Sequence, residues 1–116
     1  MTNLDVLDAL IKWADRDLED RYLVVLHEHG GTFCNEVVRL YGIDEIIERN
    51  EVYETKKYCP GFLTIADDSG GRAVLIALGK IPSPVYLVDH GSMSQEDFIE
   101  IAPDMDTWMK RGCPVD

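Results

Sequence analysis

The sequence predicts an α+β fold: a mainly antiparallel sheet packed by helices near the N-terminus, in the middle of the chain and at the C-terminus. Two patterns support this prediction. Apolar residues recur at helical spacing in the first and last parts of the chain, whereas residues 62–88 contain short β-rich runs separated by glycines and prolines. The length of 116 residues suits one domain. We therefore expect residues 1–116 to form a single domain.

The first predicted helix covers Leu4 to Ala14. Its apolar stripe consists of Leu4, Leu7, Ile11 and Ala14, widened by Leu10 and Trp13. Asp8 and Lys12 stand four residues apart in the acid-first order that stabilises a helix. Thr2 or Asn3 is expected to cap its start.

A second helix is predicted to begin near Asp17, which would be its N-cap, and to end at Gly30-Gly31. A short strand is expected within Glu36–Tyr41, which contains two valines and a tyrosine. Asp44 is the expected N-cap of a third helix, which would run to about Thr55.

The centre of the sheet is predicted to be a hairpin. Residues 62–66 and 72–78 flank an acidic, glycine-containing loop at 67–71. The second run is apolar on both faces, so we expect it near the middle of the sheet. Two prolines make Gly79–Pro84 a loop, and Val85–Val88 is the next expected strand.

The last part of the chain combines an ambiguous segment with a helix. Residues 98–102 are compatible with either a strand or a helical turn. Pro103-Asp104 is expected to start a final helix that stops at Gly112. The aromatic residues expected mostly in the core are Trp13, Tyr22, Tyr53, Phe98 and Trp108.

Charge excludes several classes of ligand. The chain has 22 Asp and Glu residues against 11 Lys and Arg residues, a formal net charge of -11. Nucleic acids and anionic membranes are disfavoured because both require clustered basic residues. The longest aliphatic run, residues 73–78, is far shorter than the ~20 residues of a membrane span. A basic protein partner suits this charge best.

The three cysteines are Cys34, Cys59 and Cys113. An odd number at wide spacing is typical neither of a disulfide framework nor of a zinc site. Together with the absence of a visible signal peptide, this spacing predicts free thiols in a cytoplasmic protein.

Two dipeptides are candidate chemical sites. Asp67-Asp68 lacks the further oxygen ligands of a calcium loop, so a role in the turn is favoured and a partner contact is the alternative. Asp89-His90 resembles a base with its orienting acid, but adjacent strand residues point to opposite faces. A cysteine nucleophile would need an electropositive pocket, which this acidic chain makes hard to assemble.

One acidic run is left without basic residues. No Lys or Arg occurs between Lys80 and Lys110. The acids in that interval are Asp89, Glu96, Asp97, Glu100, Asp104 and Asp106. They would form either a solvated acidic surface or one edge of the domain that steers a basic partner.

Several phrases then follow one another in a specific order. They are Leu18-Glu19-Asp20-Arg21-Tyr22-Leu23 with Gly30-Gly31, Leu40-Tyr41-Gly42-Ile43-Asp44, Ile65-Ala66-Asp67-Asp68-Ser69-Gly70-Gly71, Val85-Tyr86-Leu87-Val88-Asp89-His90, and Ile101-Ala102-Pro103-Asp104-Met105 with Trp108. This order resembles the SUKH superfamily, whose best-known branch is the yeast cell-wall-assembly regulator (Smi/Knr) type. The resemblance implies a helix-packed antiparallel sheet without a shared catalytic activity. It also implies protein binding, because many bacterial members look like immunity proteins that neutralise a nuclease or deaminase toxin.

We therefore expect a non-enzymatic, cytoplasmic immunity protein that occludes the active site of a basic toxin. The alternative is an intracellular regulatory scaffold that docks cellular proteins through an apolar groove, and a small hydrolase is a third hypothesis. No cofactor, metal ion, nucleic acid or membrane is expected as a ligand. The residues expected to contact the partner are Asp67, Asp68, Asp89, Glu96, Asp97, Asp104 and Asp106.

Overall fold

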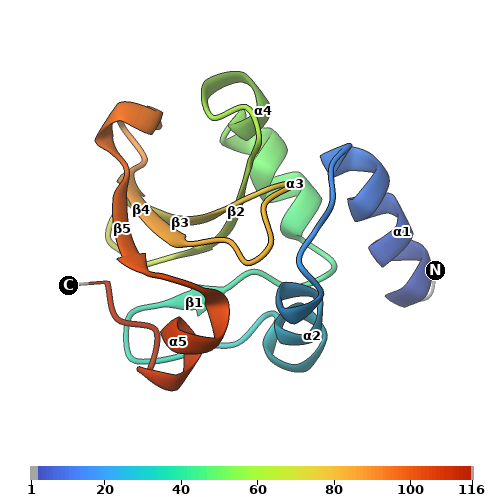
Figure 1. Cartoon of the computed structure of the whole chain (residues 1–116), viewed down its shortest axis with the longest axis horizontal. Coiled ribbons are helices and arrows are strands. Elements are labelled where there is room, and N and C mark those ends of the chain that lie inside the picture. Colours follow the sequence, from blue (N-terminus) through green and yellow to red (C-terminus); the bar gives the residue numbers. More distant parts are fainter. Residues whose placement is uncertain (1–2, 116) are drawn as a thin grey trace.

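The computed structural model describes residues 3–115, and these form a sheet with surrounding helices (Figure 1). The α-helices are α1 (Asn3–Ala14), α2 (Asp20–His29), α3 (Ile46–Val52), α4 (Thr55–Tyr58) and α5 (Met105–Lys110). The strands are β1 (Arg39–Leu40), β2 (Phe62–Asp67), β3 (Arg72–Ala77), β4 (Val85–Asp89) and β5 (Ile99–Ala102), with a 3-10 turn at Gln95–Asp97. All neighbouring strands are antiparallel, in the order β1-β2-β3-β4-β5. The predicted α+β class is confirmed.

The main core covers one face of the sheet. Val74 and Ile76 of β3 are fully buried and point to this face. Side chains from four helices pack in the same cluster, namely Leu10 and Ala14 of α1, Tyr22, Val25 and Leu26 of α2, Ile46 of α3, and Met105 and Trp108 of α5. Figure 1 shows α1, α2 and α3 on one side of the sheet, with α5 against its lower end.

A smaller core covers the opposite face. It contains Cys59, Ala73, Leu75, Val88 and Met93, all buried. Because Val74 and Leu75 belong to different cores, β3 is covered on both faces. The prediction that this strand lies in the middle of the sheet is confirmed.

Most predicted elements have the expected positions. The first helix, the hairpin, the strand after Pro84 and the final helix are all present. Residues 98–102, which were compatible with two structures, contain the edge strand β5.

Tyr22 and Trp108 are buried, whereas Trp13, Tyr53 and Phe98 are only partly buried. Ile11 was wrongly placed on the buried stripe: it is 43% exposed, because α1 packs through Leu10 and Ala14. Of the two caps expected for this helix, Thr2 lies outside the described residues and Asn3 is within α1.

The predicted start of the second helix is wrong. It begins at Asp20 with Glu19 as N-cap, not near Asp17. The backbone carbonyl of Asp17 accepts a hydrogen bond from the Gly79 N–H at 2.8 Å, which ties this segment to the loop between β3 and β4. Because of this tertiary backbone contact, the helix begins further along the chain than predicted.

The predicted strand at 36–41 is much shorter than expected. The side chain of Asn35 accepts hydrogen bonds from the N–H groups of Val37 and Val38, so these groups cannot pair in the sheet. Only Arg39–Leu40 remains as β1.

The third predicted helix is divided. Glu54 has a left-handed backbone (φ 52°) and separates α3 from α4, and α3 is preceded by Glu45 rather than capped by Asp44.

Asn50 completes the sheet where β1 ends. This fully buried residue of α3 accepts from the Thr64 N–H at 2.7 Å and donates to the Thr64 carbonyl at 2.9 Å. Its amide also donates to the Ile46 carbonyl within the helix. The side chain thus replaces a neighbouring strand at this point of β2, because buried backbone groups must be hydrogen-bonded.

The expectation of free thiols is wrong for two cysteines. Cys34 and Cys113 form a disulfide, with Cα atoms 6.2 Å apart, and Cys59 is a buried free cysteine. The Asn35 amide supports the same junction by donating to the carbonyls of Gly112 and Cys113. A sequence separation of 79 residues gave no local signal for this pair. The cysteine argument for a reducing compartment therefore no longer applies.

Replacing Asn50 tests its role in the sheet. We expect Asn50→Ala to lower the free energy of unfolding by about 2–3 kcal/mol, because it leaves the N–H and carbonyl of Thr64 buried without partners. Urea unfolding followed by circular dichroism measures this. Glu51→Ala, at an exposed position of the same helix, is the control. Equal stability of the two variants would contradict the role assigned to Asn50.

The disulfide provides a second test of stability. Reduction should lower the free energy of unfolding by about 2–4 kcal/mol, because the cross-link restricts a long loop in the unfolded chain. Urea titrations with and without dithiothreitol measure the difference. In the double variant Cys34→Ser, Cys113→Ser the reductant should have no effect. An effect of equal size in both proteins would show that the disulfide is not its source.

Candidate protein-binding site

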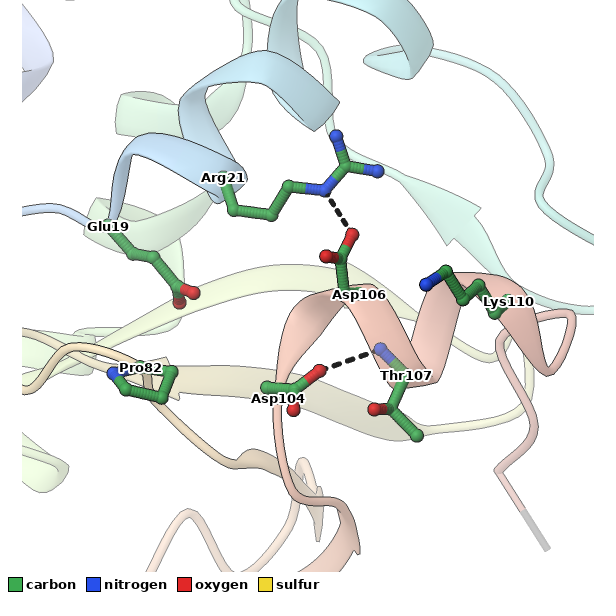
Figure 2. Close-up of a pocket in the computed structure, with 7 residues that line it drawn as sticks. All are labelled: Glu19, Arg21, Pro82, Asp104, Asp106, Thr107 and Lys110. Atoms are coloured by element: carbon green, nitrogen blue, oxygen red, sulfur yellow. Dashed lines mark hydrogen bonds and ion pairs between the residues drawn. The ribbon is translucent and has the colours of Figure 1, made fainter.

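Three carboxylates meet at a hollow between the start of α2, the loop before β4 and the start of α5. They belong to Glu19, Asp104 and Asp106, hereafter the pocket acids. The hollow has a volume of about 390 Å³ and is also lined by Arg21, Pro82, Thr107 and Lys110. Figure 2 shows the carboxylate of Glu19 directed toward the space between Pro82 and Asp104. Two of the predicted partner contacts, Asp104 and Asp106, therefore lie in one concave site.

Glu19 is the most enclosed of the pocket acids. The residue is only 8% exposed, and one carboxylate oxygen accepts a long hydrogen bond, 3.4 Å, from the Ser83 N–H. Burial raises the pKa of Glu19, and the charges of Asp104 and Asp106 raise it further, against the opposing effect of the Ser83 hydrogen bond. Among the ion pairs of the described residues, none includes Glu19. Its charge is thus poorly compensated.

Asp104 is held in place by α5. Its carboxylate accepts from the Thr107 N–H at 2.7 Å, which makes Asp104 the N-cap of α5. The hydrogen bonds from Thr107 lower the pKa of Asp104, with a smaller contribution from Lys110 and Arg111. Asp104 therefore presents a stable negative charge at the helix start.

Asp106 has a basic partner that the sequence pattern did not indicate. Its carboxylate lies 2.5 Å from the Nε atom of Arg21 in α2, and both side chains are about half exposed. The acidic run between Lys80 and Lys110 is therefore compensated at this position by a residue from outside the run. Figure 2 shows the remaining guanidinium nitrogens of Arg21 directed away from the hollow.

The hairpin acids Asp67 and Asp68 lie at the opposite end of the sheet from the hollow. Asp67 accepts from the Tyr41 hydroxyl at 2.9 Å and from the Ser69 N–H. Asp68 is 8% exposed and pairs with Arg72 at 2.6 Å. Burial alone would raise the pKa of Asp68, but hydrogen bonds from Arg72 and Gly70 outweigh it and lower the pKa. Both side chains stabilise the turn.

The remaining predicted contacts lie near that same end. Asp89 ends β4 opposite Arg72, and its carboxylate accepts from the Gly91 N–H at 2.7 Å. Glu96 and Asp97 are exposed in the 3-10 turn that precedes β5, and Ser92 donates to Asp97. The strand β5 separates these three acids from Asp104 and Asp106, so the acids between Lys80 and Lys110 do not share one edge of the domain.

Glu19 was missed by sequence reasoning. It lies far from the acidic run in sequence and was passed over in favour of Asp17 as the helix cap. The available signal was the pair of adjacent acids at the start of α2, Glu19 and Asp20. Only the tertiary structure places Glu19 beside α5. Its burial depends on the loop that contains the fully buried Ser83.

His90, Asp89 and Cys59, the candidate residues for chemistry, each make contacts other than those of a catalytic pair. His90 stacks on Tyr53, with ring centroids 4.5 Å apart, while the carboxylate of Asp89 accepts a hydrogen bond from the Gly91 N–H in the turn that follows. Burial raises the pKa of the Cys59 thiol, which lies 3.2 Å from the Met93 carbonyl, so this thiol is not activated. The described residues contain no group of three His, Cys, Asp or Glu side chains suited to a metal ion. They also contain no helix with the length and apolar character of a membrane span.

Comparison with known proteins identifies the family. The model of the SMI1 / KNR4 family (SUKH-1) matches residues 2–111. Among curated proteins, no sequence matches this chain significantly. Domains of this family commonly bind proteins and are generally non-catalytic. Because the match spans nearly the whole sequence, the chain belongs to the SMI1 / KNR4 family (SUKH-1).

Proposed function

We propose that this protein is an immunity protein that binds a basic toxin and occludes its active site. The observation that carries this proposal is the enclosed carboxylate of Glu19, which lies in an open hollow beside two further acids and has no basic partner among the described residues. A buried charge without a counter-charge is costly, and a basic side chain from outside would compensate it. The hollow is therefore suited to a Lys or Arg side chain of a partner.

The rim of the hollow favours such an insertion. Arg21 holds Asp106 in place without entering the space beside Glu19 (Figure 2). The incoming cation would face Glu19, whose carboxylate points toward the space between Pro82 and Asp104, and Asp104 at the other side of that space (Figure 2). Charge-assisted hydrogen bonds to carboxylates are among the strongest in proteins.

The overall charge supports the class of partner. A formal charge of -11 steers a positively charged protein toward the molecule, with association that weakens at high salt. Nucleases and nucleic-acid deaminases carry basic clefts for phosphate, and acidic side chains placed in such a cleft exclude the substrate. In this proposal the exposed acids Asp89, Glu96 and Asp97 add to the electrostatic attraction of the basic partner. Asp67 and Asp68 hold the turn between β2 and β3.

Charge reversal at the hollow tests the proposal. The neighbouring genes would be searched for a secreted toxin domain, which would be co-expressed with the chain while growth and binding affinity are measured. We expect Asp106→Lys to weaken toxin binding by about tenfold or more, which is the loss typical of removing one partner of an interfacial charge pair. The affinity of the variant should also depend less on salt concentration. Glu51→Lys, the same charge reversal at an exposed position of α3, should retain most of the affinity. Full protection from toxicity by Asp106→Lys would contradict the proposed contact.

Glu19→Gln separates stability from binding. The raised pKa of Glu19 means that its ionised form destabilises the folded protein above that pKa. The amide keeps the shape and removes the charge, so it should stabilise the free protein by about 1 kcal/mol at pH 7 and weaken partner binding. The gain should disappear as the pH falls through the raised pKa toward 4.5, since Glu19 is then protonated.

Urea unfolding at pH 4.5 and pH 7 measures this difference. Glu48→Gln, an exposed residue of α3, is the matched control and should change little at either pH. Lower stability of Glu19→Gln at pH 7 would show that the carboxylate is satisfied within the protein and not kept for a partner.

A further inference from the structure

A second surface combines aromatic rings with an acid on the sheet face away from the main core. Phe62, Tyr86 and Phe98, hereafter the aromatic trio, contact one another with ring centroids 4.9–5.7 Å apart. Phe62 begins β2, Tyr86 lies in β4, and Phe98 directly precedes β5. All three rings are only partly buried, so part of the trio is open to solvent.

Glu100 stands beside this trio. It is exposed and lies directly opposite Tyr86 in the pairing of β4 with β5. Side chains that are directly opposite in antiparallel strands share one face of the sheet. Burial raises the pKa of Tyr86, and the charge of Glu100 raises it further, so the phenol remains protonated and neutral. A carboxylate and aromatic rings therefore share one open surface.

Basic residues of the chain occupy other rings. Within residues 3–115, the ring–cation contacts are Arg49 with Tyr41, Lys56 with Trp13, and Lys57 with Tyr58. Arg16 and Lys56 line a hollow together with Phe62, and the Nζ atom of Lys56 is placed over Trp13. Tyr86 and Phe98 themselves belong to the interval between Lys80 and Lys110, in which the sequence has no Lys or Arg.

We propose that the aromatic trio and Glu100 form a docking site for an arginine side chain of a basic protein partner. A planar guanidinium stacks on aromatic rings and at the same time forms hydrogen bonds to a carboxylate. A lysine ammonium is more strongly hydrated and has no plane to stack, so arginine is the favoured residue. Tyrosine and arginine are also frequent among the residues that dominate interface affinity.

Charge complementarity decides against a second copy of this chain at the same surface. A copy would bring its own Glu100, and each molecule has a formal charge of -11. Like charges opposed across an interface weaken association. The proposal rests on the proposed function only in that the partner is a basic protein, because the trio is separate from the pocket acids.

A peptide titration tests the site without a known partner. The probes are the capped pentapeptide Gly-Arg-Gly-Arg-Gly and its lysine counterpart, titrated into the isotope-labelled full chain at low salt. We expect the largest NMR shift changes at Tyr86, Phe98 and Glu100, and affinity about threefold higher for the arginine peptide. Equal affinity for both peptides, or shift changes confined to the pocket acids, would overturn the proposal.

Substitutions then separate the site from general attraction. Glu100→Gln and Tyr86→Leu should each weaken arginine-peptide binding about threefold to tenfold, whereas Glu96→Gln removes the same charge from the adjacent turn and should change it little. Similar losses in Glu100→Gln and Glu96→Gln would reduce the effect to net charge and overturn the site. Sedimentation that detects a dimer abolished by Tyr86→Leu would also overturn it.

The two proposals fail separately. Glu19→Gln should leave the peptide shifts at Tyr86 unchanged, because Glu19 lies at the start of α2 in a different hollow. If the peptide contacts the trio while toxin binding is absent, the proposed function fails and the arginine site stands. If toxin binding depends on Asp106 while the trio is silent, the reverse holds.

Discussion

Burial of β3 on both faces is the constraint on which the rest of the structure depends. Val74 and Ile76 face one core while Ala73 and Leu75 face the other, so each face of the sheet must be covered. Four helices cover the first face. The second face is covered only in part, by the two segments that contain Cys59 and Met93. The aromatic trio remains partly exposed for this reason.

The same constraint creates the acidic hollow. Covering the first face brings α2 and α5 together, although they come from opposite ends of the sequence. Both helices begin with acids, and acids at helix starts are favoured by the helix dipole and by capping. Packing two such starts against the loop at Ser83 concentrates negative charge and encloses Glu19. The site is thus a by-product of ordinary helix chemistry that becomes specific through tertiary contact.

Much of the architecture could be predicted from local patterns. The hairpin, the central strand, the final helix and the family resemblance depended on short segments whose residues interact with near neighbours. Three features that the local patterns did not predict share a different cause. Asp17 is tied to Gly79, Asn50 replaces a missing strand beside Thr64, and Cys34 meets Cys113. Each of these contacts joins distant segments through backbone groups or a covalent bond that no local pattern records.

The predicted partner-binding residues show the same difference between local patterns and tertiary contacts. The sequence by itself determined the α+β class, the family and the excess of acidic residues, because composition and periodicity are properties of the chain alone. Only the tertiary structure decided that Asp68 is buried in a turn, that Asp106 is paired with Arg21, and that Glu19 is enclosed. The physical reason is that the environment of a charge depends on burial and on neighbours brought together by folding.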